Sequence, residues 1–340
     1  MHNKRYILLL LLISFFMAEN WQYSADKAEI KKKGGKQIRQ FTGNVVMSKG
    51  SLQLWTNQAV EYTEDNQVHL YGKIKMIDND KIIKCDQLVY YTNDDYCVAY
   101  NDVILTQDSQ VISSDTLYYW SEIDSIQGLG SVKIIDSASK RELESNRLYI
   151  SSPDSISTIL KLYDSAKALN IVKARVSEKS PFMIFEDELQ GEEIEVLIKR
   201  DTIRNLNIYG MAIADYNVIK DSLLVGANNI SGDSIMMIFK NQNLSAMKIR
   251  GGGIGKFIPE KGNSKVDSTV YYEAEYIDYI IQAEQSILKK QAQVDYGDTS
   301  IESGNIIVDW DTNMLDADYA YETYPIVSRG GESPMIGESM

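Results

Sequence analysis

The sequence predicts an all-β protein built as a stack of repeats, an open sandwich of the β-jellyroll or solenoid type. Short Val/Ile/Leu/Tyr runs alternate with Ser, Asn, Asp and Gly, and the 340 residues include 22 Tyr but only 5 Pro. The chain also repeats itself at a constant spacing, which indicates stacked units. One such unit cannot enclose a core, so the core must form between neighbouring copies.

The composition excludes several classes of function. The chain has 35 Lys and Arg against 48 Asp and Glu, a formal net charge of -13, whereas a nucleic-acid binder needs a basic excess. It has only 2 His, one of them at position 2, so a histidine-based triad or zinc site cannot be assembled. We therefore predict no enzymatic activity, no cofactor, no metal and no nucleic-acid partner.

The N-terminus predicts export. Lys4 and Arg5 precede an apolar run, Tyr6–Met17, that is shorter than the roughly 20 residues of a membrane-spanning helix. Residues 1–18 are interpreted as a signal peptide, with cleavage within about 18–25. Residues 19–39 are predicted to be a flexible basic segment. Its cluster of positive charges comprises Lys31, Lys32, Lys33, Lys36 and Arg39.

Residues 40–150 are predicted to form a first jellyroll from four copies of a 29-residue repeat. Each copy opens at a residue that tolerates positive φ, and an Asn or Asp precedes its second strand. We interpret these residues as the heads of turns, each followed by a strand that buries one face. They are Gly43, Gly72, Asn101 and Gly130, then Asn57, Asp86, Asp115 and the slipped Asn146. The predicted inward stripe contains Leu54, Ile83, Ile112, Ala59, Leu88, Leu117 and Leu148.

A second array, residues 185–327, repeats at an offset of 41 residues, as in the match of Leu189–Ile194 to Ile230–Ile235. Residues 151–184 are irregular and are interpreted as a joint that contains one helical stretch, 156–169. Residues 328–340 form a tail or the start of a further unit. Cys85 and Cys97 could pair in an oxidising compartment or remain core thiols.

The repeats resemble the LptA/OstA-like lipopolysaccharide-transport family. The resemblance rests on Gly72–Ile77, Asp86–Tyr91 and Gly130–Ile135, and on the Gly-Asp-Ser-Ile of Gly232–Ile235. It covers residues 40–150 and, more weakly, 185–320. It implies an open β-jellyroll whose apolar interior holds the acyl chains of lipid A.

The resemblance also implies a place and partners. The protein would be periplasmic and associated with the outer membrane, either as an LptA-like bridge or as the N-terminal part of an LptD-like assembly protein. Its partners would be lipopolysaccharide and other Lpt-type jellyrolls that add at edge strands, with head-to-tail self-association as a further possibility.

The candidate lipid-binding groove wall consists of apolar residues that the repeat directs inward. These residues could equally fill a closed core without binding lipid. They are Met47, Leu54, Ile74, Met76, Ile83, Leu88, Val103, Leu105, Ile112, Leu117 and Ile134.

Two alternatives remain open from the sequence: a secreted β-solenoid acting on or adhering to polysaccharide, and a structural periplasmic scaffold without lipid. The first needs carboxylates aligned in neighbouring coils, and Asp86 and Asp115 are in register. Gly251–Gly255 is interpreted as a turn or bulge, because the Lys-Ser/Thr of a phosphate loop is missing. Acidic pairs such as Asp94 and Asp95 lie at ordinary turn positions and are assigned no metal.

Overall fold

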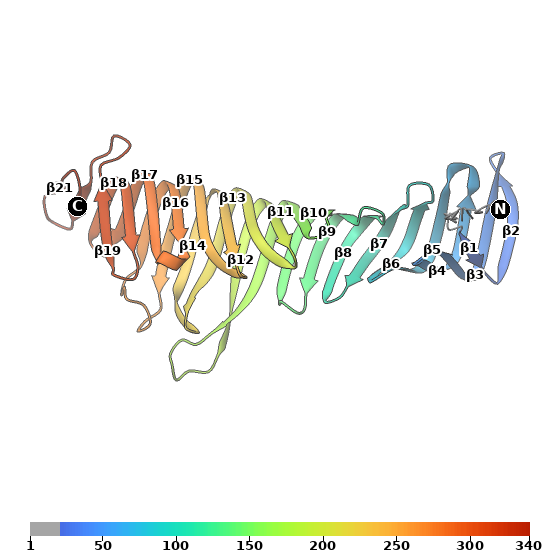
Figure 1. Ribbon diagram of the computed structural model, residues 1–340, viewed down its shortest axis with the longest axis horizontal. Coiled ribbons are helices and arrows are strands. Elements are labelled where there is room, and N and C mark those ends of the chain that lie inside the picture. The colour runs from blue at the N-terminus through green and yellow to red at the C-terminus, as the bar shows by residue number, and fades with distance from the viewer. Residues whose placement is uncertain (1–20) are drawn as a thin grey trace, which may run out of the picture.

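The computed structural model describes residues 21–340, so the predicted signal peptide lies outside the described part of the chain. The described residues form a single sheet of 21 strands with two short 3-10 helices, η1 (Thr63–Asp65) and η2 (Ile281–Ala283). Figure 1 shows an elongated stack with β2 and β21 at opposite ends. The predicted all-β, open jellyroll-type fold is confirmed.

From β3 to β19 each strand pairs antiparallel with the next strand along the chain. The short strands β1, β2, β20 and β21 complete the two ends of the sheet. The strands are β1 Gln22–Ser24, β2 Lys27–Lys33, β3 Lys36–Lys49, β4 Leu52–Tyr62, β5 Gln67–Asp78, β6 Lys81–Tyr91, β7 Tyr96–Gln107, β8 Gln110–Trp120, β9 Ser125–Asp136, β10 Arg141–Asp154, β11 Ser157–Ala174, β12 Met183–Lys199, β13 Thr202–Lys220, β14 Leu223–Lys240, β15 Asn243–Pro259, β16 Val270–Ile280, β17 Gln285–Tyr296, β18 Thr299–Asp309, β19 Met314–Asp318, β20 Ile326–Arg329 and β21 Met335–Ile336.

Every odd-numbered strand from β3 to β17 bends in its middle at two consecutive residues with positive φ. The strand pairing shifts register at each bend, as in a β-bulge. The predicted turn heads are therefore wrong as turns: the 29-spaced residues are bends within strands. The bend pairs are Gly43–Asn44, Gly72–Lys73, Asn101–Asp102, Gly130–Ser131, Asp164–Ser165, Gly210–Met211, Gly251–Gly252 and Lys290–Gln291.

Opposite the first bends, the even-numbered strands place an inward hydroxyl or thiol followed by an Asn or Asp. Ser114 donates to the carbonyl of Thr116 at 3.0 Å, and Ser145 donates to that of Arg147 at 2.9 Å. Thr56 makes the corresponding contact with the carbonyl of Gln58 at 3.4 Å. These buried donors satisfy carbonyls that the shifted register leaves without a ladder partner.

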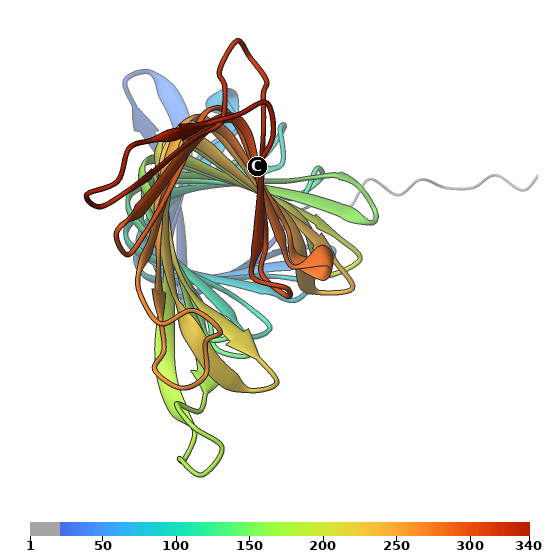
Figure 2. The same ribbon diagram turned by 90° about the vertical axis from the view of Figure 1, so that its left-hand side faces the viewer.

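The bend divides each long strand into two arms that cover one common core. In β5, Leu70 lies before the bend and Met76 after it, and both are almost completely buried in the same apolar cluster. Viewed along the stack, the strands wrap around the long axis (Figure 2). The turns consequently gather in two rows, one at the end of each arm.

We call the turns that follow odd strands the first row and those that follow even strands the second row. The first row comprises residues 50–51, 79–80, 108–109, 137–140, 175–182, 221–222, 260–269 and 297–298. The second row comprises residues 63–66, 92–95, 121–124, 155–156, 200–201, 241–242, 281–284 and 310–313. We call the line along which the two rows meet the seam.

The sheet continues without interruption through the predicted joint, residues 151–184. β11 occupies most of it and pairs with both β10 and β12, so the predicted helical stretch is wrong. The apolar residues of this stretch alternate with a period of two, which suits a strand with one buried face. The 41-residue offset also has a simple cause, because β14 and β15 have 18 and 17 residues where β8 and β9 have 11 and 12.

The basic segment is also part of the sheet. The expectation of a flexible segment up to residue 39 is wrong from Gln22 on, because β1, β2 and the start of β3 lie there. β1 and β2 pair with successive parts of β3 and form the first edge of the sheet.

Both cysteines are buried free thiols, so the structure shows the core-thiol alternative. Burial raises the pKa of the Cys85 thiol to about 12. The Cys97 sulfur lies 3.9 Å from the Met76 sulfur, inside the apolar cluster.

A substitution series at two bends tests their role. Gly72→Ala and Gly130→Ala should each lose about 1–2 kcal/mol of unfolding free energy, because both positions have a φ near +75° to +80°. Gly130→Ala should lose about 1–2 kcal/mol more, since its new Cβ would overlap the Asp115 side chain, whereas a Cβ at Gly72 would make only ordinary van der Waals contact with Asn57. Denaturant unfolding measures both values.

The double variant Asp115→Ala/Gly130→Ala is the control, and it should remove most of the extra loss. Equal losses in the two single variants would show that the overlap of the new Cβ at position 130 with Asp115 does not lower the unfolding free energy.

Candidate functional site

The interior of the stack is the candidate site, and all of the predicted groove-wall residues lie in it. Each of them is at most 5% exposed and belongs to the one apolar core cluster. They are Met47, Leu54, Ile74, Met76, Ile83, Leu88, Val103, Leu105, Ile112, Leu117 and Ile134. Burial places these residues inside the protein; contact of these residues with lipid stays a prediction.

Inward and outward apolar residues are sharply separated along the strands. Leu105 is 1% exposed while its neighbour Ile104 is 42% exposed, and Ile134 and Ile135 differ in the same way at 5% and 41%. Neighbouring residues of a strand face opposite sides of the sheet. The first half of the molecule thus offers matched pairs of apolar residues, one inside and one outside.

The interior continues through the second half, which the sequence-based list omitted. The 41-residue alignment already paired Ile194 with Ile235 and Ile208 with Ile249, and this pairing could have extended the list. The fully buried aliphatic residues of this half include Ile194, Ile208, Ile230, Ile235, Ile249, Ile277 and Ile306.

A buried polar group also lies inside the second half, and the sequence did not predict it. Tyr272 Oη donates to Asn228 Oδ1 at 2.5 Å, and Asn228 Nδ2 donates to Tyr216 Oη at 2.7 Å. Tyr279 Oη accepts from the same amide nitrogen at 3.4 Å, and burial raises the pKa of Tyr279 to about 12. These mutual hydrogen bonds allow four polar side chains to be buried together.

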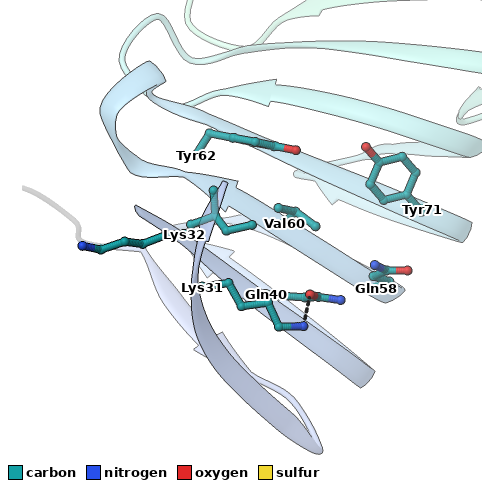
Figure 3. A pocket seen from close by; sticks show the side chains of 8 residues that line it. Lys31, Lys32, Gln40, Gln58, Val60, Tyr62 and Tyr71 are labelled. Carbon is teal, nitrogen blue, oxygen red and sulfur yellow. Dashed lines mark hydrogen bonds between the residues drawn. The ribbon is translucent and has the colours of Figure 1, made fainter. Parts of the chain in front are cut away.

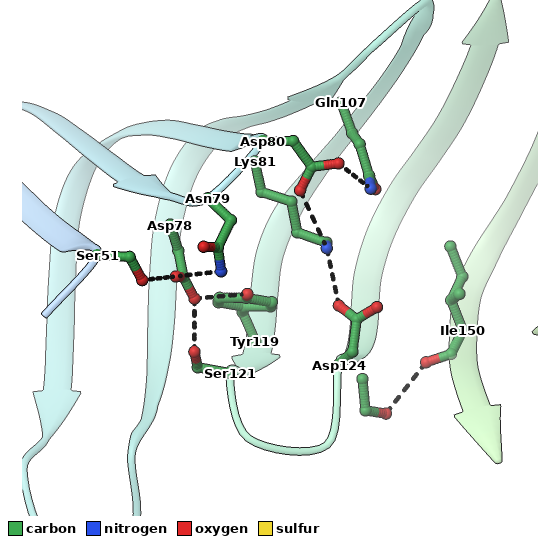
Figure 4. A network of polar contacts seen from close by, with 11 residues as sticks. Ser51, Asp78, Asn79, Asp80, Lys81, Gln107, Tyr119, Ser121, Asp124 and Ile150 are labelled. Atoms are coloured by element: carbon green, nitrogen blue, oxygen red, sulfur yellow. Dashed lines mark hydrogen bonds and ion pairs between the residues drawn. The ribbon is translucent and has the colours of Figure 1, made fainter. Parts of the chain in front are cut away.

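Polar side chains close the seam near the N-terminal end (Figure 4). Asp78, at the end of β5, is 2% exposed and accepts hydrogen bonds from Tyr119 Oη at 2.8 Å and Ser121 Oγ at 2.5 Å. Next to it, Lys81 Nζ lies 2.8 Å from an Asp124 carboxylate oxygen. Burial and the Asp78 carboxylate raise the pKa of Tyr119, which keeps its hydroxyl a donor.

The same kind of contact recurs along the seam with a regular offset. Lys49 pairs with Asp95 at 2.7 Å, Lys220 with Glu284 at 2.6 Å, and Lys265 with Asp311 at 2.9 Å. Each contact joins a first-row turn to the second-row turn one place later. Side chains far apart in sequence thus close the seam toward both ends.

The middle of the seam differs from its ends. With this offset of one place, the three first-row turns between residues 108 and 182 lie opposite the three second-row turns between residues 155 and 242. Within residues 21–340, no side-chain hydrogen bond or ion pair joins these two groups of turns; polar side chains such as Ser109, Thr202 and Asn243 bond within their own row. This part of the seam therefore lacks the polar contacts found on either side.

A hollow with a volume of about 570 Å³ lies at the N-terminal end, on the outer face of the sheet (Figure 3). Lys31 and Lys32 of β2 line it, and Lys31 Nζ donates to Gln40 Oε1 at 2.8 Å. Val60 and Tyr71 come from β4 and β5. A second hollow of about 340 Å³ lies at the bends of β5 and β7 and includes the buried Ile74 and Cys85.

The two ends of the sheet carry opposite charge. β2 holds Lys27, Lys31 and Lys32, and within residues 21–340 no strand pairs with its outer edge. At the other end, β18 is covered by β19 and β20, and acidic residues outnumber basic ones over residues 314–340. These acids include Asp316, Asp318, Glu322 and Glu338.

The carboxylates that suggested a polysaccharide site lie beside bends. Asp115 contacts the backbone of Gly130, and Asp86 lies where the pairing of β6 with β7 shifts register. Asp95 and Asp311 are occupied in the seam ion pairs. Among residues 21–340, no group of three or more His, Cys, Asp or Glu side chains could hold a metal ion, and no helix could span a membrane.

Comparison with known proteins locates a family in the first part of the chain. Residues 22–140 match the family described as OstA-like protein. This segment is therefore similar to OstA-like proteins. The match confirms the resemblance drawn from the repeats of the first array, and it begins at β1, earlier than the sequence alone suggested.

Among solved structures, the chain is similar to LptH from Pseudomonas aeruginosa, described as the LptA homologous periplasmic component of the lipopolysaccharide transport device. The alignment has 13% identity and a TM-score of 0.32, and it covers 44% of this chain and 92% of that one. No curated protein sequence matches the chain.

Two neighbouring aspartates at the seam should differ strongly in how much their replacement by alanine lowers the unfolding free energy. Asp78→Ala should lower the unfolding free energy by about 3 kcal/mol, because it leaves the buried Tyr119 hydroxyl without its acceptor. Asp80→Ala should cost less than about 1 kcal/mol, since that half-exposed carboxylate bonds only Gln107 and Lys81. Chemical denaturation compares the two, and equal losses would contradict a structural role for the Asp78 contacts.

Proposed function

We propose that the protein binds and transports lipopolysaccharide in the periplasm by holding lipid A acyl chains between the two walls of the stack. The observation that carries the proposal is the continuous, largely apolar interior, which extends from β3 to β19 and is closed by side chains at the seam. The OstA-like segment supports the same function.

The energetics favour acyl chains as the cargo. Each buried methylene contributes about 0.8 kcal/mol, so a single long chain gives substantial binding. The strand pair that repeats every 29 or 41 residues supplies similar apolar sites one after another. A lipid can therefore move along the stack between sites of comparable free energy.

Entry needs the seam to part, because side chains fill the interior. A partly exposed ion pair contributes only about 0–1 kcal/mol, whereas the backbone ladder is continuous along the stack. The walls therefore separate more readily than neighbouring strands do. The middle of the seam, without polar contacts between its turn rows, is the easiest place for this separation.

We place the protein in the periplasm, associated with the outer membrane, as a bridge or as the first part of an assembly protein. The outer edge of β2, with which no strand among residues 21–340 pairs, fits strand addition by another jellyroll. The basic β2 edge and the acidic last strands also favour head-to-tail contact between copies.

Photo-crosslinking at matched pairs tests the cargo. A benzophenone amino acid at Leu105, Ile112 or Ile134 should yield lipopolysaccharide adducts. The outward neighbours Ile104, Val111 and Ile135 should yield few, because they lie on the other face of the same strands. The three inward positions guard against one variant that fails to fold, and circular dichroism identifies folded samples. Folded inward variants without lipid adducts would refute the proposal.

Self-association should depend on the first edge. Light scattering should show a mass that rises with protein concentration and falls with added salt, since screening weakens contact between charged ends. Ile30→Glu, at a 70% exposed position of β2, should reduce this association. Ile123→Glu, at a 61% exposed turn position, should not. A constant monomer mass would exclude association through the sheet ends.

A further inference from the structure

An exposed apolar segment lies where β12 begins, in the middle of the seam, where no polar contacts join the two rows of turns among residues 21–340. Phe182, Met183 and Ile184, which we call the lip, are 52%, 46% and 64% exposed. They are consecutive, so alternation along a strand cannot turn all of them inward. Isolated exposed apolar residues are ordinary, but a contiguous group marks an interaction surface.

The local backbone keeps the lip apart from the rest of the sheet. β12 pairs with β13 only from Glu188 onward, whereas residues 183–187 pair with β11 alone. Asn217 of β13 fills the gap by donating its backbone N–H to Asp187 Oδ1 and its side-chain amide to the Glu186 carbonyl, each at 2.9 Å. The lip therefore lies at the end of the β11–β12 hairpin, whose loop is held at Arg175 by a backbone bridge to Leu223 and at Val176 by the Asn263 amide.

The hairpin reaches outward. In Figures 1 and 2 the loop between β11 and β12 extends farther from the long axis than the neighbouring loops do. Such a tip is convex, and a convex apolar tip inserts into a soft surface more readily than it binds a peptide, which needs a groove.

The loop that precedes the lip is basic. Residues 173–181 contain Lys173, Arg175 and Lys179 against one acid, Glu178, and the acids Glu186–Glu188 follow on the sheet side of the lip. Lys173 pairs directly with Ile184 across β11 and β12, so both face the same side. The Arg175 guanidinium lies 4.4 Å from the centre of the Phe182 ring.

We infer that the lip docks the middle of the protein on an anionic lipid bilayer. The three apolar side chains enter the interfacial region while the flanking basic groups meet lipid phosphates, the arrangement used by peripheral membrane proteins. Lys173 and Lys179 are exposed and can extend their charged ends toward the headgroups. This surface is separate from the interior to which the proposed function assigns lipid.

Vesicle co-sedimentation of the exported chain tests the inference. The protein should bind vesicles of phosphatidylcholine and phosphatidylglycerol, and bind pure phosphatidylcholine weakly. Phe182→Ser/Ile184→Ser should weaken binding by about tenfold or more, since the apolar contact is lost. Met335→Ser/Ile336→Ser, an equally exposed apolar pair in β21, is the control and should leave binding unchanged. Lys173→Gln/Lys179→Gln should reduce the preference for the anionic vesicles.

A second measurement does not depend on the folding of the serine variant. An environment-sensitive NBD label is attached to the variant Ile184→Cys. The label reacts selectively at this position because the two native thiols are buried. Its emission should shift to the blue with anionic vesicles, and that of a label at Met335→Cys should not. No shift at position 184, or unchanged binding in the folded lip variant, would overturn the inference. The inference would also be overturned if the label at position 184 contacted a second molecule of the protein instead of the vesicle. Interior crosslinks at Leu105 remain independent of the lip.

Discussion

The architecture depends on one backbone constraint, the pair of left-handed residues in every second strand. A flat meander of this length would leave one apolar face in water. The bend folds each strand across its own middle, so both arms bury their inner side chains in one core. Glycine serves at the first position in β3, β5, β9, β13 and β15, but Asn101, Asp164 and Lys290 serve elsewhere. Each bend therefore requires a backbone conformation, which the shifted strand register supports, and does not require one particular residue type.

This construction makes the molecule strong in one direction and weak in another. Along the stack, the backbone ladder joins every strand to the next. Across the seam, the walls are joined by side chains such as Asp78 with Tyr119 and Lys49 with Asp95, which come from distant parts of the sequence. A lipid that enters between the walls has to displace only these side-chain contacts. The geometry thus supports a container that opens sideways while its length stays fixed.

The surface divides into regions with different chemistry. The first edge, β2, is basic and lacks an outer strand in the described residues, and the last strands are acidic. The lip lies between them, at the part of the seam without polar contacts. The proposed contacts with other proteins use the ends, and the proposed contact with a bilayer uses the middle. The overall acidity, which gives lipid phosphates no general attraction, is offset locally by Lys173 and Lys179.

The sequence by itself determined the fold class, the repeat and the inward face, because alternation and spacing are local properties that burial imposes on every strand. It therefore identified the buried wall, including Leu88 and Leu117, and the OstA-like segment. It could not distinguish a bend from a turn, since Gly72 tolerates positive φ in either. Nor could it show the seam or the lip. Both depend on which side chains meet across the core, and only the tertiary fold brings Asp78 to Ser121.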